Sequence, residues 1–238
     1  MSQSPQVKAV FLDAAHTILR LARPYPEMFK AALDKHGLPR PYQSIESSLR
    51  KCWEVSEDNF SGANGDYRMN DDIDRALWHD FYRLMLRDLG IESFPVELLD
   101  EIYHQFSIPS NWELFPETLE TIQGLHERGI IVGLGSNWDS GLPRILKHLG
   151  VLEQLDCVII SAIIGFRKPS REFFLAEAQA AGVEPAEVIH VGDHPVADVK
   201  GAIDTGLRAA LVWRTSHPAP ESYGAPVIPS LLGILDHL

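Results

Sequence analysis

From about residue 115 to residue 213, segments typical of helices alternate with segments typical of buried strands, and this alternation constrains the fold more than any other feature. The strand-like segments are short apolar runs, and the helix-like segments repeat apolar residues at helical spacing. With a first strand at 7–13, the predicted strands are 7–13, 130–137, 157–162, 187–193 and 207–213. Such a series predicts an α/β fold, a Rossmann-like open parallel sheet with helices on both faces.

The region between residues 20 and 109 breaks this alternation. It contains helix-like segments at 25–37, 45–57, 72–90 and 96–106, with no convincing strand among them, and a polar loop at 59–72. A helical block after the first strand leaves the rest of the chain to complete the sheet. We therefore expect a core domain formed by residues 1–19 and 110–238 and an inserted, all-helical cap domain formed by residues 20–109.

Composition and charge narrow the range of partners. The 238 residues carry a net charge of −12, which argues against binding to nucleic acid or to anionic membranes. We find no apolar region typical of a signal peptide and no run approaching the ~18 apolar residues of a membrane span. The two cysteines lack a metal-binding spacing and suit a reducing compartment. These features predict a soluble, cytoplasmic protein, and they leave the oligomeric state open.

Polar residues at the ends of the predicted strands are candidates for a functional site. They are Asp13 after the first strand, Ser136 and Asn137 after the second, Lys168 after the third, and Asp193 with Asp198 after the fourth. Each taken singly has a structural explanation, such as a helix cap, a turn residue or a surface lysine. In open parallel sheets, however, ligands bind beyond the carboxyl ends of the strands. Three carboxylates, a hydroxyl and a lysine at one edge therefore indicate a functional site.

These residue types suit phosphoryl transfer. Asp13, together with Asp193 or Asp198, offers the hard oxygen ligands that Mg²⁺ prefers, and the metal would reduce repulsion between an anionic nucleophile and a phosphate. Ser136 and Lys168 can stabilise the oxygens of the phosphoryl group during transfer. We therefore predict Mg²⁺ as the cofactor, a small phosphorylated substrate, and Asp13 as a nucleophile that forms an aspartyl-phosphate.

Four motifs follow one another in the chain: D-x-x-x-T from Asp13, S-N at Ser136, K-P at Lys168 and G-D-x-x-x-x-D ending at Asp198. Together they resemble the motifs of the haloacid dehalogenase (HAD) superfamily, and the helical insertion resembles that superfamily's C1-type cap. The resemblance implies a hydrolase of the phosphatase type with catalytic roles for Asp13, Ser136 and Lys168. Dehalogenation is not implied, because dehalogenases of this fold work without metal and lack G-D-x-x-x-x-D.

The resemblance also implies the Mg²⁺ ligands. They would be the carboxylate of Asp13, the backbone carbonyl of Ala15 and the carboxylate of Asp193, with Asp198 supporting the metal. Asn137 directly follows Ser136, and His16 lies three residues after Asp13. Both are expected to contact the substrate.

One position departs from the pattern of the superfamily. HAD phosphatases place an aspartate two residues after the nucleophile, where it protonates the leaving oxygen and later activates water, but this chain has Ala15. General acid–base catalysis contributes roughly 10²–10⁴ in rate, so we expect slow hydrolysis. His16 is a candidate substitute, because its ordinary pKa suits a proton shuttle.

Two alternatives remain open at this point. Alanine at position 15 also resembles phosphonoacetaldehyde hydrolases, which cleave a carbon–phosphorus bond through a Schiff base on a cap lysine, and Lys51 is the candidate for that lysine. The second alternative is a protein of low activity that binds a phosphorylated ligand or serves a regulatory role. Ala15 favours it, whereas the retained Asp13 argues against it.

Overall fold

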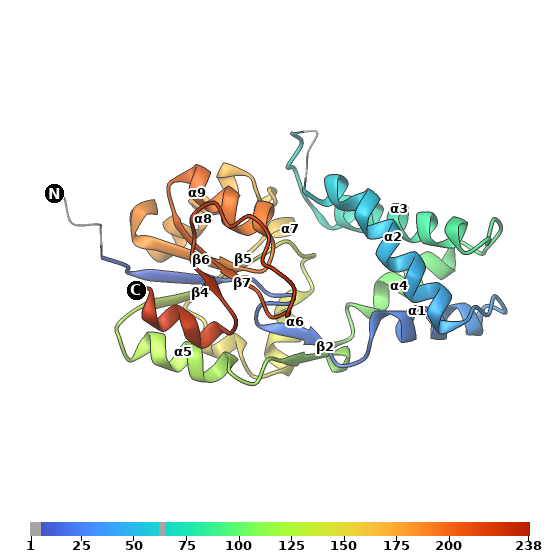
Figure 1. Cartoon of the computed structure of the whole chain (residues 1–238), viewed down its shortest axis with the longest axis horizontal. Helices are drawn as coiled ribbons and strands as arrows, with labels where there is room; N and C mark the ends of the chain where they lie inside the picture. The colour runs from blue at the N-terminus through green and yellow to red at the C-terminus, as the bar shows by residue number, and fades with distance from the viewer. Residues whose placement is uncertain (1–5, 62–64) are drawn as a thin grey trace.

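The computed structural model describes residues 6–61 and 65–238, and over these residues the chain forms an α/β body and a helical body (Figure 1). The sheet of the described chain has six strands, all parallel to their neighbours. Their spatial order is β5 (Cys157–Ile160), β4 (Ile131–Ser136), β1 (Ala9–Leu12), β6 (Val188–Gly192), β7 (Arg208–Val212) and β8 (Val227–Ile228). This confirms the predicted Rossmann-like parallel sheet.

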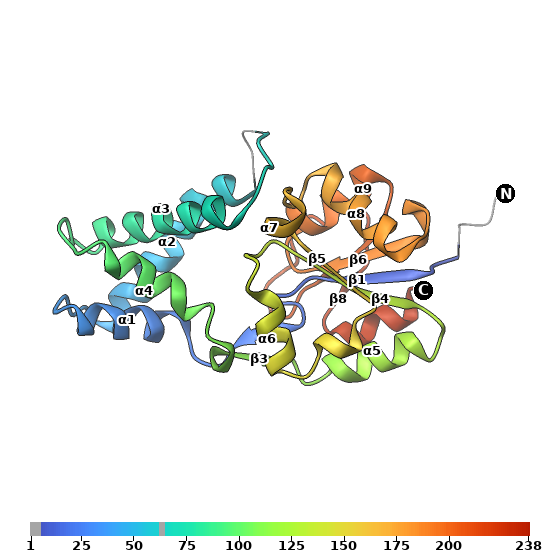
Figure 2. The ribbon, with the colours of Figure 1, turned by 180° about the vertical axis from the view of Figure 1, so that it is seen from behind.

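Strand β1 lies inside the sheet between β4 and β6 and is buried on both faces. Val10 and Leu12 pack into one hydrophobic cluster, whereas Ala9 and Phe11 pack into another, as the two-residue repeat of a strand requires. The first cluster is covered by α5 (Thr118–His126), α6 (Leu142–His148) and the 3₁₀ helix Leu231–Asp236. The second is covered by α7 (Ser161–Ile164), α8 (Arg171–Ala181) and α9 (Gly201–Thr205), on the opposite face (Figures 1 and 2).

The helical body contains α1 (Tyr25–Lys35), α2 (Tyr42–Ser61), α3 (Asp71–Asp88) and α4 (Glu97–Gln105). It has a hydrophobic core of its own, in which Phe29, Ile45 and Leu98 are buried. Helix α3 begins after Asn70, whose side-chain oxygen accepts a hydrogen bond from the backbone N–H of Ile73 at 2.8 Å. None of the helices in the described residues is long and apolar enough to cross a membrane.

Two segments connect the helical body to the sheet, and they pair with each other as short strands. Strand β2 (Leu19–Leu21) runs antiparallel to β3 (Trp112–Leu114), and Arg20 forms an ion pair with Glu113 at 2.8 Å. The expectation that residues 20–110 contain no strand is therefore wrong at its N-terminal edge, and β3 and β8 were also missed. Segments of two or three residues are too short to show the two-residue apolar repeat from which strands are predicted.

The remaining predicted elements are present with adjusted bounds. The predicted helix after β6 is a π-helix over Pro195–Lys200 that continues as α9, and short 3₁₀ helices occupy Pro109–Asn111, Leu152–Gln154 and Pro185–Glu187. The predicted loop at 59–72 begins later, because α2 extends to Ser61, and its residues 62–64 lie outside the described residues. Cys52 and Cys157 are free thiols.

Candidate active site

The side chains predicted from the strand ends meet at one edge of the sheet. Asp13 follows β1, its backbone N–H donates to the carbonyl of Val191 at 2.8 Å, and its side chain is almost completely buried. Ser136 ends the neighbouring strand β4, and its hydroxyl donates to Oδ1 of Asp13 at 3.0 Å. The parallel pairing of β1 with β4 therefore brings together two residues that are 123 positions apart in the sequence.

Lys168 supplies a buried positive charge at this edge. Its Nζ lies 2.6 Å from Oδ1 of Asp13 and 2.6 Å from Oδ1 of Asp198, and it also donates to the carbonyl of Gly135 at 3.0 Å. Burial alone would lower the pKa of Lys168, but the two carboxylates raise it above its ordinary value. The lysine is therefore charged at neutral pH and can attract a phosphoryl group.

Asn137 holds the backbone of this lysine. Its Oδ1 accepts the backbone N–H of Lys168 at 2.8 Å, and its Nδ2 donates to the carbonyl of Lys168 at 3.1 Å. Its amide thus positions the lysine, in addition to the predicted role in contacting the substrate.

The three carboxylates of Asp13, Asp193 and Asp198 could hold a metal ion, because one oxygen of each lies within 4.8 Å of the others. Burial raises the pKa of Asp193 well above its ordinary value, and repulsion from Asp198 and Asp13 adds to the effect. Burial acts in the same direction on Asp198, but Lys168 and His190 hold its pKa well below the ordinary range. The ionised form of Asp193 is therefore favoured only when a cation lies beside it.

His190 and Glu177 form a buried pair next to Asp198, which the sequence analysis did not predict. Nδ1 of His190 lies 2.9 Å from Oε1 of Glu177, and its Nε2 lies 3.2 Å from Oδ1 of Asp198. Burial would lower the pKa of His190, but Glu177 and Asp198 raise it to about 9, so the ring is an imidazolium at neutral pH. The visible signals were a histidine within the apolar strand β6 and a glutamate on the apolar face of α8.

Gly192, the glycine of G-D-x-x-x-x-D, is required because a larger residue has no space at this position. A Cβ atom at Gly192 would lie 2.2 Å from the carboxylate carbon of Asp198. Only glycine therefore allows Asp198 to pack against the end of β6 and reach Lys168.

Together, the described residues of this network include two cationic groups, Lys168 and His190, and four carboxylates. These carboxylates belong to Asp13, Glu177, Asp193 and Asp198. A divalent cation would balance the charge when all four are ionised. Carboxylate oxygens are also the ligands that Mg²⁺ prefers, so the residues present fit this metal.

Ala15 and His16 lie on the turn after Asp13, the predicted nucleophile. His16 adopts a left-handed backbone conformation with φ of 59°. Loss of hydration beside the surrounding protein lowers the pKa of His16, while Asp13 acts in the opposite direction. Its imidazole is therefore mostly neutral at pH 7. Ala15 brings no titratable group to this turn.

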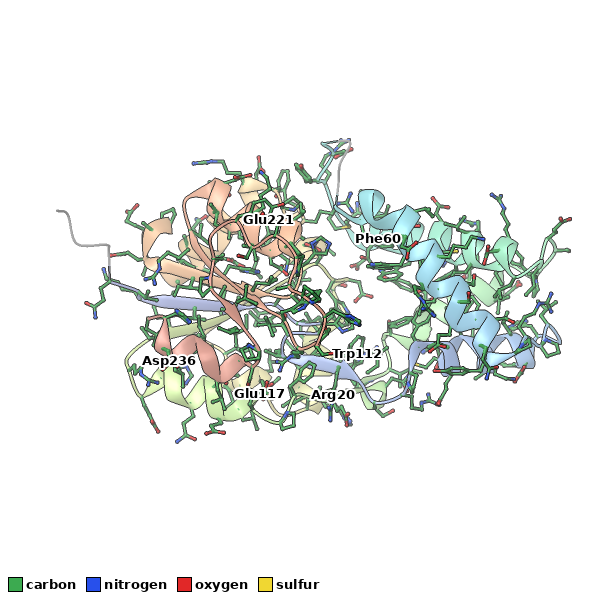
Figure 3. All side chains as sticks on the ribbon, viewed as in Figure 1. Arg20, Phe60, Trp112, Glu117, Glu221 and Asp236 are labelled. Atoms are coloured by element: carbon green, nitrogen blue, oxygen red, sulfur yellow. The ribbon has the colours of Figure 1, made fainter. Side chains whose placement is uncertain are left out.

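A cavity of about 480 Å³ extends from this turn toward the helical body. Ala15, His16 and Asn137 line its end at the sheet, and aromatic residues line much of the rest, among them Tyr25, Trp53, Trp78, Phe81, Tyr82 and Phe106. Figure 3 shows Trp112, another lining residue, at the junction of the two bodies, with Phe60 on α2 in the helical body. The cavity therefore runs from the turn after Asp13 to the helical insertion. Its described lining residues do not include Asp13, Ser136, Lys168, Asp193 or Asp198 themselves.

Lys51, the candidate for a Schiff base, is elsewhere. Its ammonium pairs with the Asp88 carboxylate, its side chain is 69% exposed, and it is not among the described residues that line the cavity. Its hydrogen bond to Asp88 raises the pKa of Lys51, whereas a Schiff-base lysine requires a lowered one. The structure gives no support to the carbon–phosphorus reaction through this residue.

Comparisons with known proteins agree with this architecture. A family model described as haloacid dehalogenase-like hydrolase matches residues 7–206. The chain is 28% identical to haloacid dehalogenase-like hydrolase domain-containing protein 3 from Mus musculus, over 100% of this chain and 97% of that protein. It is 34% identical to a phosphoserine phosphatase from Thermus thermophilus, over 47% of this chain and 45% of that protein.

A solved structure gives the same fold. The magnesium-bound form of the putative HAD-hydrolase YfnB from Bacillus subtilis superimposes with a TM-score of 0.76, at 16% identity, over 98% of this chain and 99% of that chain. The family match covers most of the chain, and the predicted superfamily is confirmed. The chain belongs to the haloacid dehalogenase-like hydrolases.

Proposed function

We propose that this protein is a Mg²⁺-dependent phosphatase that hydrolyses a small phosphorylated metabolite through an aspartyl-phosphate on Asp13. The observation that carries the proposal is the convergence of Lys168 and Ser136 on one carboxylate oxygen of Asp13, at 2.6 Å and 3.0 Å. This arrangement puts a nucleophile, a cation and a hydroxyl donor at the same point. The similarity to a phosphoserine phosphatase supports the same reaction class.

The metal would be held by Asp13, Asp193 and the backbone carbonyl of Ala15, with Asp198 beside them. When bound, Mg²⁺ would neutralise negative charge on the phosphate and on the nucleophile. Asp198 already accepts hydrogen bonds from the backbone N–H of His194 at 2.9 Å and from Lys168. We therefore assign Asp198 mainly to holding Lys168 in place.

In the first step, a carboxylate oxygen of Asp13 attacks phosphorus and the bond from phosphorus to the substrate alcohol oxygen breaks. Lys168 and Ser136 stabilise the phosphoryl oxygens during this transfer. In the second step, water attacks the same phosphorus, the bond to Asp13 breaks, and inorganic phosphate leaves. The Asp13 carboxylate is regenerated.

Proton transfer is the step for which this site offers the fewest groups. The departing alkoxide needs a proton and the attacking water must lose one, but Ala15 can do neither. Neutral His16 lines the cavity three residues after Asp13 and is the candidate for this role. We propose that esters with poor leaving groups react slowly, while substrates whose leaving group needs no proton react faster.

The helical body would act as a cap over this site. We propose that residues 1–19 and 110–238 form the core and residues 20–109 the cap, with the β2–β3 ribbon at the junction. Closure would exclude water and complete the substrate pocket. Interdomain movement is described for the Bacillus subtilis relative and supports this role for the junction.

Acetyl phosphate is the probe that tests the proposed reaction most cleanly, since its leaving group needs no proton. We expect hydrolysis that requires Mg²⁺, is lost with EDTA, and is absent in Asp13→Asn. Hydrolysis that persists in Asp13→Asn would assign the reaction to another group. Tight binding of phosphate compounds without turnover would instead support a protein that binds a phosphorylated ligand.

A further inference from the structure

The walls of the cavity indicate what kind of alcohol the substrate carries. Trp78 stacks nearly parallel to Phe106, with ring centroids 6.0 Å apart, and lies similarly against Tyr82, at 6.0 Å. On the sheet side, Trp112 and Trp138 pack with centroids 4.9 Å apart. These rings come from α3, from the end of α4, from the start of β3 and from the segment that follows β4. They surround the space that begins at the turn after Asp13.

The charged residues of the cavity are mostly acidic. Among the described lining residues, Glu54, Asp74 and Asp139 carry carboxylates and Arg50 carries a guanidinium. Glu54 and Arg50 are both exposed, which leaves Asp74 and Asp139 as the partly buried charges. An anionic group on the substrate's alcohol part would therefore be repelled. A cationic group would be attracted both by these carboxylates and by the aromatic faces.

Two of the carboxylates share a single hydroxyl proton. Oη of Tyr103 lies 2.7 Å from Oδ2 of Asp74 and 2.9 Å from Oδ2 of Asp139, but a phenol donates one hydrogen bond at a time. Asp139 also accepts the backbone N–H of Gly141 at 2.7 Å through its other oxygen. Asp74 is therefore the carboxylate with capacity left for a ligand.

A buried hydroxyl on the same wall also lacks a partner. Tyr82 lines the cavity and is fully buried, and its Oη has no hydrogen-bond partner in the described part of the chain. Buried polar atoms in folded proteins are nearly always hydrogen-bonded, so this oxygen is an exception. The oxygen is enclosed by protein atoms and does not open into the cavity, so a ligand there would not contact it.

We propose that this cavity is a leaving-group pocket for a cationic nitrogen, so that the substrate class is the phosphate monoester of an alcohol bearing an ammonium or alkylammonium group. This deepens the proposed function and rests on it for the hydrolytic step. The phosphate faces Lys168 and Ser136, while the nitrogen lies against the rings of Trp78 and Phe106 beside Asp74. Both ends of the substrate then meet groups of opposite charge.

Binding of the alcohol alone tests the pocket without the phosphate site. The probes are choline and its neutral isostere 3,3-dimethylbutanol, titrated while the fluorescence of the cavity tryptophans is recorded. We expect choline to bind about tenfold more tightly, in line with the strength of cation–π and charge contacts in a partly desolvated pocket. In Asp74→Asn, which keeps the shape and removes the charge, the preference should fall severalfold.

Asp72→Asn is the matched control. Asp72 lies on the same helix α3, its side chain is 85% exposed and pairs with Arg75, and it does not line the cavity. This variant should keep the preference for choline. Glu54→Gln removes another carboxylate that lines the cavity, at an exposed position on α2, and should also lower the preference for choline. It supplies an independent test if Asp74→Asn does not fold.

Hydrolysis of choline phosphate and of 3,3-dimethylbutyl phosphate completes the experiment, with acetyl phosphate alongside. Asp13-dependent hydrolysis of acetyl phosphate with equal binding of the two alcohols would overturn the pocket assignment and leave the proposed function intact. Tighter binding of 3,3-dimethylbutanol would overturn it in favour of a purely apolar pocket. A preference for choline without hydrolysis of any phosphate would support the pocket and overturn the proposed function.

Discussion

The ammonium nitrogen of Lys168 lies 2.6 Å from a carboxylate oxygen of Asp13, and the two side chains are only 3% and 9% exposed. Removing one partner of a buried ion pair typically costs 3–5 kcal/mol, because the other charge remains buried and uncompensated. We therefore predict that Lys168→Met lowers the free energy of unfolding by roughly 3 kcal/mol. It should also lower hydrolysis of acetyl phosphate by at least about 100-fold. Urea unfolding and steady-state kinetics provide the two readouts.

The control for this variant is Lys147→Met, which removes an exposed lysine on α6 and should change stability by less than about 0.5 kcal/mol. Adding Asp198→Asn to Lys168→Met should recover part of the lost stability, because it removes one of the two carboxylates that have lost the charge of Lys168. Equal stability of Lys168→Met and the native protein would contradict the buried ion-pair network.

The sequence predicted the parallel sheet and the residues at its edge for a common physical reason. Apolar runs such as that of β1 have few alternatives to a buried strand, and parallel strands bring their carboxyl ends to one edge, which unites Asp13 with Ser136. The Glu177–His190 pair could not be predicted in this way, because its contact depends on how α8 packs on β6. The cavity depends on the approach of the helical body, which no local pattern encodes.

Asp193→Asn tests the metal site. Asp193 is half-buried beside two other carboxylates. Burial and these carboxylates raise its pKa and make its ionised form unfavourable in the metal-free protein, and asparagine removes that cost. We predict that this variant melts at a higher temperature than the native protein in EDTA. Mg²⁺ should raise the melting temperature of the native protein by mass action, and it should have little effect on the variant.

Differential scanning fluorimetry over a series of Mg²⁺ concentrations measures both effects. Asp204→Asn, an exposed carboxylate on α9 that pairs with Lys200, is the control and should respond to Mg²⁺ like the native protein. An unchanged Mg²⁺ response in Asp193→Asn would remove Asp193 from the metal site.

Ala15→Asp tests whether the alanine at this position limits turnover, as we propose. The new carboxylate would stand where HAD phosphatases keep their general acid, and general acid–base catalysis contributes roughly 10²–10⁴ in rate. We predict a gain of about 100-fold with an alkyl phosphate, and little gain in the transfer step with acetyl phosphate, whose leaving group needs no proton. Ala15→Asn has nearly the same shape and no proton to exchange, so an equal gain in that variant would rule out acid–base catalysis as the cause.

The pH dependence of stability reports on Asp74. Burial raises its pKa to about 6, and repulsion from Asp139 and Asp71 adds to the shift, while Tyr103 opposes it. Because the folded protein holds this proton more tightly than the unfolded chain, where the pKa is about 3.9, stability is lost as pH rises between about 4 and 6. Asp74→Asn removes that loss.

Relative to the native protein, Asp74→Asn should therefore gain about 2–3 kcal/mol in free energy of unfolding between pH 4 and pH 8. Urea denaturation at several pH values measures this difference, with Asp72→Asn as the control that should show no such trend. A constant difference across the pH range would contradict the raised pKa.

Trapping of the phosphoenzyme tests the central claim most directly. Without a carboxylate at position 15 to activate water, the aspartyl-phosphate should break down slowly and accumulate when the protein is mixed with acetyl phosphate and Mg²⁺. After acid quenching and proteolysis, mass spectrometry should find one phosphoryl group on the peptide that contains Asp13, and none in Asp13→Asn or in EDTA. A phosphoryl group that persists in Asp13→Asn, or hydrolysis by the native protein without any trapped phosphoenzyme, would contradict Asp13 as the nucleophile.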